Sequence, residues 1–237
     1  MTEEPSLRSG RRISVVVDND SWIQPWAEQL VQRCRDELGD DAVLLRSYDE
    51  ICEGLAAIFM GCLGIAPKHI LARNQHNLVP HASALPHGRG FAPLAWQIIE
   101  GYDQIPVSLI EAAEGPDEGP IYCQTVVHFA GHELHDELRA GVGAACVELC
   151  MQFLVSDELL EPTPQSGKPS WYRRRTPADS ELDPGHPLAE QFDLLRTVDN
   201  ERYPAYFRYR GHVYRLKIEK ADARAAHRHT TDKGDGE

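Results

Sequence analysis

The sequence predicts an α/β fold built on a parallel sheet, because strand-like and helix-like segments alternate along it. Three short runs of β-branched or apolar residues, at 13–18, 42–45 and 55–60, each favour a buried strand. Helical segments between them indicate right-handed crossovers between parallel neighbours. With 237 residues and 42% hydrophobic content, the chain can bury one sizeable core and a smaller second one.

The other elements follow from residue spacing and from helix-breaking residues. Residues 26–38 carry apolar side chains at helical spacing and stop at Gly39, which is typical of a helix C-terminus. A long amphipathic pattern over 132–155 predicts a second major helix. The remaining expectations are a helical turn at 48–54, a helix at 92–99, strands at 107–112 and 121–127, a helix at 188–196 and a hairpin at 205–218.

A Pro- and Gly-rich run, EPTPQSGKPS at residues 161–170, is typical of a linker between domains. It predicts a core at residues 1–160 and a small domain at 171–220. Residues 221–237 are polar and contain few apolar side chains, so we expect this tail to be disordered.

Composition excludes several classes of protein. The formal net charge of −13 argues against a nucleic-acid partner, because an acidic surface repels phosphate backbones. No apolar run approaches the roughly 18 residues of a membrane span, and the N-terminus lacks the apolar segment of a signal peptide. The six cysteines form no CxxC pair, which favours reduced thiols in a cytoplasmic protein. A homodimer is also compatible with the sequence.

The densest set of chemically capable side chains lies between residues 74 and 117. It combines the amide of Asn77, the imidazole of His81, the hydroxyl of Ser83 and the carboxylate of Asp117. Functional groups on loops at strand ends are typical of sites in open α/β sheets. A hydrolytic or group-transfer site is one interpretation, and a Pro-rich loop with one structural histidine is the other.

Two motifs in this region resemble the folate-dependent formyltransferases. Residues 81–86 have the sequence HASALP, which matches H-x-S-x-L-P, and residues 117–119 have the sequence DEG, which matches the D-x-G of that family. The resemblance covers roughly residues 55–154 and implies a Rossmann-like formyltransferase core with a parallel sheet, plus a small C-terminal α+β subdomain. Residues 175–179, RTPAD, are similar to an element of the branch that formylates amino sugars.

The resemblance implies transfer of a formyl group from 10-formyltetrahydrofolate to a primary amine, without a metal. A nucleotide-linked amino sugar is the expected acceptor. Asn77 and His81 would donate hydrogen bonds to the formyl oxygen, and His81 would also accept or relay the amine proton. Asp117 would orient the imidazole. The family's asparagine lies two residues before the histidine, where this chain has Val79, so we expect a bulge near Pro80 to bring Asn77 into place.

Binding residues are also implied. The resemblance assigns the co-substrate to two loops and to the Gly-rich turn after His81, through Leu63, Gly64, Ile65, Ser83, Gly88, Glu114 and Gly115. The acceptor would contact Trp22, Arg89, Arg174 and Arg175, with Arg174 and Arg175 in the basic run 173–175 binding a phosphate. Alternatively, the arginines form a solvated basic strand and Trp22 is a packed residue after a turn.

Several other functions stay open. Methionyl-tRNA formylation fits the core motif, but the acidic charge argues against it, and glycinamide ribonucleotide formylation leaves the C-terminal segment unexplained. A non-catalytic binding module that retained the fold would account for Val79. The histidines at 128, 132 and 135 suggest a metal site, but in HExxH the second histidine lies four positions after the first, and in HELH it lies three positions after.

Overall fold

The structure is a computed structural model that describes residues 10–156 and 160–221. The chain divides into two compact units, Met1–Arg175 and Thr176–Glu237. The segment predicted as a linker, residues 161–170, therefore belongs to the first unit, as do residues 171–175. The reason is a strand pairing that the sequence does not reveal: β8 (Trp171–Tyr172) lies parallel to β5 (Arg89–Gly90). Most of the tail predicted to be disordered, residues 222–237, lies outside the described residues.

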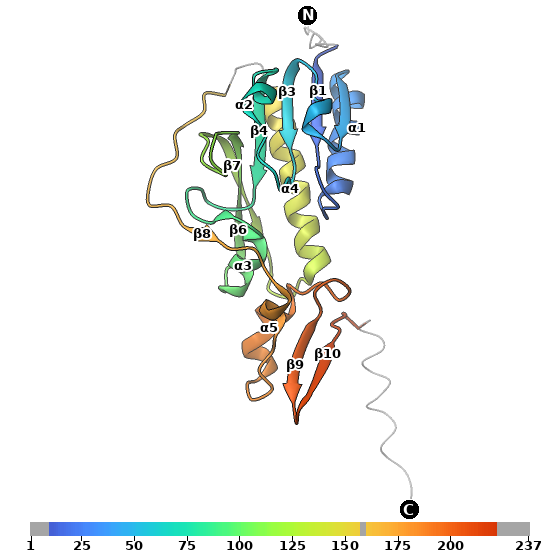
Figure 1. Ribbon diagram of the computed structural model, residues 1–237, viewed down its shortest axis with the longest axis vertical. Helices are drawn as coiled ribbons and strands as arrows, with labels where there is room; N and C mark the ends of the chain where they lie inside the picture. Colours follow the sequence, from blue (N-terminus) through green and yellow to red (C-terminus); the bar gives the residue numbers. More distant parts are fainter. Residues whose placement is uncertain (1–9, 157–159, 222–237) are drawn as a thin grey trace, which may run out of the picture. The chain divides into compact units, whose positions relative to one another are not determined.

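A six-stranded sheet with the order β2-β1-β3-β4-β6-β7 forms the centre of the first unit (Figure 1). The first four strands in this order are parallel, while β6 and β7 run antiparallel to their neighbours. The sheet is thus mixed and mostly parallel. Its strands are β1 (Arg12–Val16), β2 (Asp41–Leu45), β3 (Gly54–Phe59), β4 (Asn74–His81), β6 (Gln104–Glu111) and β7 (Ile121–His128).

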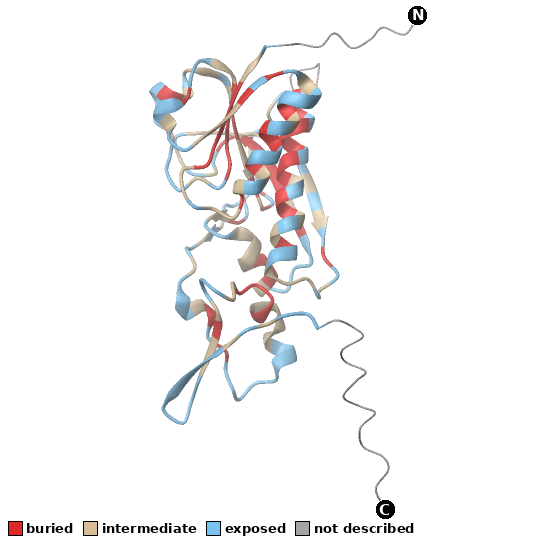
Figure 2. Cartoon of the chain, turned by 90° about the vertical axis from the view of Figure 1, so that its right-hand side faces the viewer, coloured by how far each residue is buried: buried red, intermediate tan, exposed pale blue. Residues whose placement is uncertain are grey.

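Helices α1 (Gln24–Leu38) and α4 (His135–Val155) pack against one face of this sheet. Their buried sides appear in Figure 2 and join alternate strand residues such as Ile13, Val15 and Ile58 in the main core. The intervening strand residues face a smaller cluster on the other side, which contains Val16, Ala57, Phe59 and Ile70. Both faces are therefore covered, as the continuous apolar runs predicted.

Helix α4 is long and apolar enough to cross a membrane by length and composition, the one such helix among the described residues. It packs against α1, β4, β6 and β7, and Leu138, Val147 and Cys150 are buried in the main core. Its hydropathy therefore matches that of a helix at the centre of an α/β core.

Strand β4 was not predicted, because Asn74–His81 combines polar residues with a proline. Its pairing with β3 extends only to Leu78, so Pro80 has a strand neighbour, β6, on one side alone. A proline lacks the backbone N–H of a central strand residue and is accommodated where one side is unpaired. Three further short elements connect the sheet: the turn Tyr48–Glu50, α2 (Lys68–Leu71) and α3 (Pro93–Ile99).

The second unit is a small α+β arrangement. Its hairpin consists of β9 (Ala205–Tyr209) and β10 (His212–Leu216), joined by Arg210 and Gly211 with φ of 48° and 82°. Positive φ at both central residues is typical of the two-residue turn that matches strand twist. The hairpin and the helical region near 188–196 were predicted, although the latter is two short turns, Leu188–Gln191 and α5 (Phe192–Leu195). Leu182, Leu195, Val198 and Ala205 form its core.

Candidate active site

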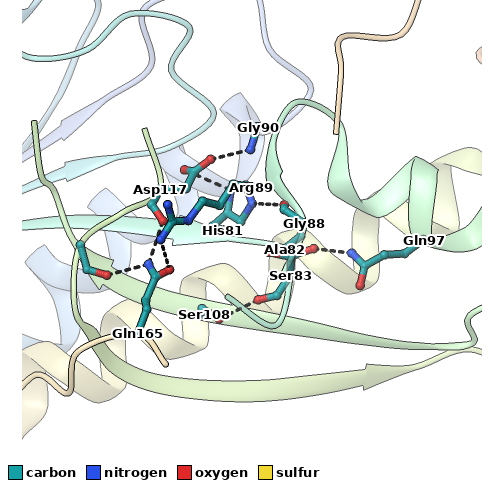
Figure 3. Close-up of polar contacts among 11 residues, drawn as sticks. His81, Ala82, Ser83, Gly88, Arg89, Gly90, Gln97, Ser108, Asp117 and Gln165 are labelled. Atoms are coloured by element: carbon teal, nitrogen blue, oxygen red, sulfur yellow. Dashed lines mark hydrogen bonds and ion pairs between the residues drawn. The ribbon is translucent and has the colours of Figure 1, made fainter. Parts of the chain in front are cut away.

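His81 ends β4 at the C-terminal edge of the parallel strands, with its side chain only 9% exposed. Its Nε2 lies 2.9 Å from the carbonyl oxygen of Gly88, and its Nδ1 lies 3.4 Å from Oδ1 of Asp117 (Figure 3). Both ring nitrogens thus face oxygen acceptors. A neutral imidazole has one N–H and can donate to only one of these oxygens at a time.

Asp117 lies in the loop between β6 and β7 and adopts a φ of 55°, which is uncommon for a residue other than glycine. Its Oδ2 accepts a hydrogen bond of 2.8 Å from the backbone N–H of Gly90. The carboxylate therefore joins His81 to the Gly88–Gly90 turn, and that turn contacts the imidazole through the Gly88 carbonyl. The structure brings together two of the three predicted catalytic residues.

Both glycines of this turn are required by their surroundings. Gly88 and Gly90 have φ of 73° and 96°, which favour glycine. A Cβ on Gly90 would lie 2.4 Å from the carbonyl oxygen of Tyr172, and one on Gly88 would lie 2.9 Å from the Tyr172 ring. The close approach of Tyr172 explains why the turn after the histidine motif is Gly-rich.

We call residues 161–175 the strap, because they run past the Gly88–Gly90 turn as part of the first unit. Thr163 exchanges two backbone hydrogen bonds of 2.8 Å with Ile121 at the start of β7. Further along, Ser170 accepts bonds from the N–H of Gly88 through its hydroxyl and from the N–H of Arg89 through its carbonyl. The strap is the main feature that sequence reasoning missed, because its polar and Pro-rich composition is the same in a solvated linker.

Asn77 is not brought to His81, which corrects the prediction of a bulge. The pairing of β4 with β3 and β6 is regular from Asn74 to His81, so the two residues are separated by four strand positions, about 13 Å. The Asn77 Nδ2 donates to the Leu71 carbonyl at 3.0 Å and to Glu111 Oε1 at 3.3 Å. Val79 lies between them and packs in the smaller apolar cluster.

Asn77, Glu111, Tyr122 and His76 form a second polar cluster, with the Glu111 carboxylate at its centre. Its carboxylate accepts from the Asn77 N–H at 2.8 Å and from the Tyr122 hydroxyl at 2.8 Å. Burial raises the pKa of the Glu111 carboxyl, and the hydrogen bonds from Tyr122 and Asn77 only partly offset this effect. His76 contacts the Tyr122 hydroxyl at 3.3 Å, and burial lowers the pKa of its imidazole.

The predicted co-substrate loop after β3 is held by Asp18, a residue that the sequence did not single out. The Asp18 carboxylate accepts from the backbone N–H groups of Leu63 and Gly64, each at 2.9 Å. Burial raises the pKa of the Asp18 carboxyl, but bonds from Asn19, Gly64 and Leu63 outweigh it and hold the pKa below its usual value. The Leu63 and Ile65 side chains remain 53% and 56% exposed.

The other predicted binding residues have different surroundings. Ser83 is 1% exposed and lies beneath Gly88, so its side chain is part of the interior. Glu114 and Gly115 lie in the loop that carries Asp117, where Glu114 is exposed and pairs with Lys68 at 2.5 Å. Trp22 packs against the main core, and the Arg139 guanidinium lies 5.5 Å from its ring centre.

The predicted arginines divide into two groups. The Arg89 side chain is 11% exposed and donates to Glu118 at 3.1 Å and to Gln165 at 2.8 Å, so its guanidinium is engaged within the fold. Arg174 lies 4.7 Å from the ring centre of Phe91, which is 41% exposed, and Arg175 lies 6.0 Å from that of Trp96. Arg174 and Arg175 thus border the turn next to His81 with aromatic partners.

Within residues 10–156 and 160–221, no cluster of three or more His, Cys, Asp or Glu side chains has the geometry to hold a metal ion.

The chain is similar to formyltransferases in sequence and in fold. A methionyl-tRNA formyltransferase of Sorangium cellulosum (strain So ce56) is 35% identical over 104 residues, which cover 43% of this chain and 33% of that protein. The matched segment thus spans about a third of the relative's length. No protein-family model matches the sequence.

Solved structures extend the likeness over most of the chain. The methionyl-tRNA formyltransferase from Clostridium thermocellum superimposes with a TM-score of 0.71 at 21% identity, covering 90% of this chain and 94% of that one. A sugar N-formyltransferase from Shewanella sp FDAARGOS_354 gives 0.63 at 18% identity, covering 90% and 99%. HypX from Aquifex aeolicus in complex with tetrahydrofolic acid gives 0.67 at 17% identity, covering 86% and 36%. The predicted resemblance and the Rossmann-like formyltransferase fold are confirmed.

Proposed function

We propose that this chain transfers a formyl group from 10-formyltetrahydrofolate to a primary amine of a small molecule. The observation that carries the proposal is the His81–Asp117 pair at the end of β4, set within the HASALP and D-x-G motifs on a formyltransferase fold. The tetrahydrofolate bound in the HypX structure supports a folate co-substrate.

In this reaction the amine nitrogen attacks the formyl carbon, and the bond from that carbon to N10 of the folate breaks. The amine loses one proton and N10 gains one, so the reaction needs a group that relays a proton between two nitrogens. His81 suits this role because imidazole both accepts and donates near neutral pH. The 3.4 Å between its Nδ1 and Asp117 is longer than a normal hydrogen bond, so Nδ1 is the nitrogen that an amine or a relay water can engage at little cost.

The formyl oxygen gains negative charge as the amine attacks. Asn77 is about 13 Å along the strand from His81 and does not supply the amide donor. Once Nδ1 of His81 has taken the amine proton, its N–H is the side-chain donor for this charge, and Asp117 compensates the positive charge on the ring. We therefore place the transfer on His81 and Asp117 and give Asn77 a structural role.

A nucleotide-linked amino sugar is the acceptor we propose. Arg174 lies over the exposed Phe91 ring beside the Gly88–Gly90 turn, and Arg175 lies near Trp96, whose ring is already stacked on Tyr172. Guanidinium groups bind phosphates in a bidentate manner, and aromatic rings stack on a base. The sugar N-formyltransferase with the same fold supports this assignment.

The test is a transfer assay with 10-formyltetrahydrofolate and a panel of nucleotide-linked amino sugars, in which tetrahydrofolate release is followed by absorbance. Turnover of one sugar, lost on Arg174→Ala but not on Arg215→Ala, which changes an exposed arginine of β10, supports the assignment. Folate binding without turnover of any amine would instead indicate a non-catalytic module.

Methionyl-tRNA is a second candidate acceptor, favoured by the 35% identical segment in a methionyl-tRNA formyltransferase. The net charge of −13 argues against it. Formylation of charged initiator tRNA that weakens steeply as salt rises would favour this acceptor over the sugar.

A further inference from the structure

We propose that Gln165, in the strap, is a positioning residue that holds Asp117 in place beside His81. The inference rests on the proposed function, because it assigns a role to Asp117 in transfer. Gln165 is half-buried although its neighbours Pro164 and Ser166 are exposed.

The amide nitrogen of Gln165 donates hydrogen bonds to the backbone of the turn that contains Asp117. Its Nε2 donates to the carbonyl oxygen of Asp117 at 2.7 Å and to that of Gly119 at 2.8 Å. An amide has two N–H donors, so both are used on this one turn. Asp117 has a φ of 55° that costs free energy, and such a conformation persists only where the surroundings fix it. The two bonds from Gln165 are contacts of this kind.

The amide oxygen of Gln165 binds Arg89, which belongs to the Gly88–Gly90 turn. Its Oε1 accepts from Nη2 of Arg89 at 2.8 Å (Figure 3). Nη1 of Arg89 donates to Glu118 at 3.1 Å. Arg89 lies between Gly88, whose carbonyl contacts His81, and Gly90, whose N–H contacts Asp117. A single side chain therefore joins the loop of Asp117 to the turn that contacts both catalytic groups.

Only an amide carries both the N–H donors for the two carbonyl oxygens of the Asp117 turn and an oxygen that accepts from Arg89. A carboxylate at this position would have no N–H to donate and would face two carbonyl oxygens. Leucine fills a similar volume but removes the donors and the acceptor together. Gln165→Glu and Gln165→Leu therefore remove the same two bonds to the turn in chemically different ways.

The experiment measures hydrogen exchange of backbone amides in the full chain together with formyl transfer. In both variants we expect the Gly90 amide, which is bonded to Asp117 Oδ2, to exchange at least about tenfold faster, because the carboxylate is no longer held. Amides of β1, such as that of Val15, should keep their rates. We expect kcat to fall on the order of 10–100-fold with the KM for folate within about twofold, as for a misplaced catalytic group.

The matched control is Ser166→Ala, which changes an exposed neighbour in the strap and should leave both measurements unchanged. Unchanged Gly90 exchange in both variants would overturn the proposal, and so would equal acceleration at Gly90 and Val15, which would indicate general destabilisation. If wild-type protein transfers no formyl group while Gly90 responds as expected, the proposed function fails and the positioning of Asp117 by Gln165 stands.

Discussion

The two polar clusters on β4 differ in what their side chains bind. Around Asn77 the partners are regular elements: the backbone of β4 itself, Glu111 of β6, Tyr122 of β7 and the end of α2. Around His81 the partners are loop atoms, namely the Gly88 carbonyl and the carboxylate of Asp117 with its positive φ. Polar groups that close contacts between strands stabilise the fold, whereas groups held among loops are where sites occur. The same strand thus carries a structural cluster and a candidate catalytic one.

The largest expected effect is the loss of formyl transfer when either His81 or Asp117, whose partners are loop atoms, is replaced. His81→Ala and Asp117→Ala should each lower kcat on the order of 10²–10⁴-fold, because general acid–base and electrostatic assistance are lost. Steady-state rates with saturating folate measure this. His128→Ala, which removes an exposed histidine at the end of β7, is the control. A variant within tenfold of wild type would have no catalytic role.

In contrast to those variants, Asn77→Ala should lower the stability of the protein and leave its rate of transfer nearly unchanged. It removes two hydrogen bonds and leaves the Leu71 carbonyl without this partner, so unfolding free energy should fall by about 1–3 kcal/mol with kcat nearly unchanged. Urea unfolding followed by fluorescence gives the stability, and the transfer assay gives the rate. A loss of kcat beyond about 100-fold at unchanged stability would return Asn77 to the catalytic group.

Val79→Asn tests whether an amide placed nearer to His81 than that of Asn77 assists the transfer. Residues 79 and 81 project to the same face of β4, so an amide at 79 would lie nearer to His81 than that of Asn77 does. We expect kcat to rise by about tenfold as an oxyanion donor is added, with some loss of stability in the apolar cluster that Val79 joins. Val79→Thr, which is of similar size and has no amide, controls for the change in packing, and an equal effect of both variants would refute the idea.

The smallest effect concerns pH. Burial raises the folded-state pKa of Glu111 above its ordinary value, so the folded protein binds more protons than the unfolded chain in the interval between the two values. Stability contributed at this site is therefore present below the ordinary pKa and is lost as pH rises through the folded one, with a slope of at most about 1.4 kcal/mol per pH unit. Glu111→Gln should flatten this part of the stability profile measured by urea unfolding. A slope identical to wild type would contradict the assignment.

The sequence predicted the parts of the fold whose signals are local. The β-branched run at β1, the apolar runs at β2 and β3 and the Gly39 stop of α1 lie within single segments, and the His81 and Asp117 motifs are short. Strand β4 was missed because its stability comes from β3 and β6 on either side rather than from its own polar residues. The strap was missed for a related reason: its pairing with Arg89 and its contacts to Asp117 depend on residues far away in the chain.

The strap also sets an order of events during synthesis. The chain leaves the ribosome from its N-terminus, and the four parallel strands of the sheet can pair once residue 81 has emerged. Gln165, Ser170 and Tyr172 follow only after α4 has been made, so the turn beside His81 lacks its last partners until then. A nascent chain that ended at residue 160 would contain all six strands of the sheet, but Asp117 and Gly88 would still lack their hydrogen bonds with Gln165 and Ser170.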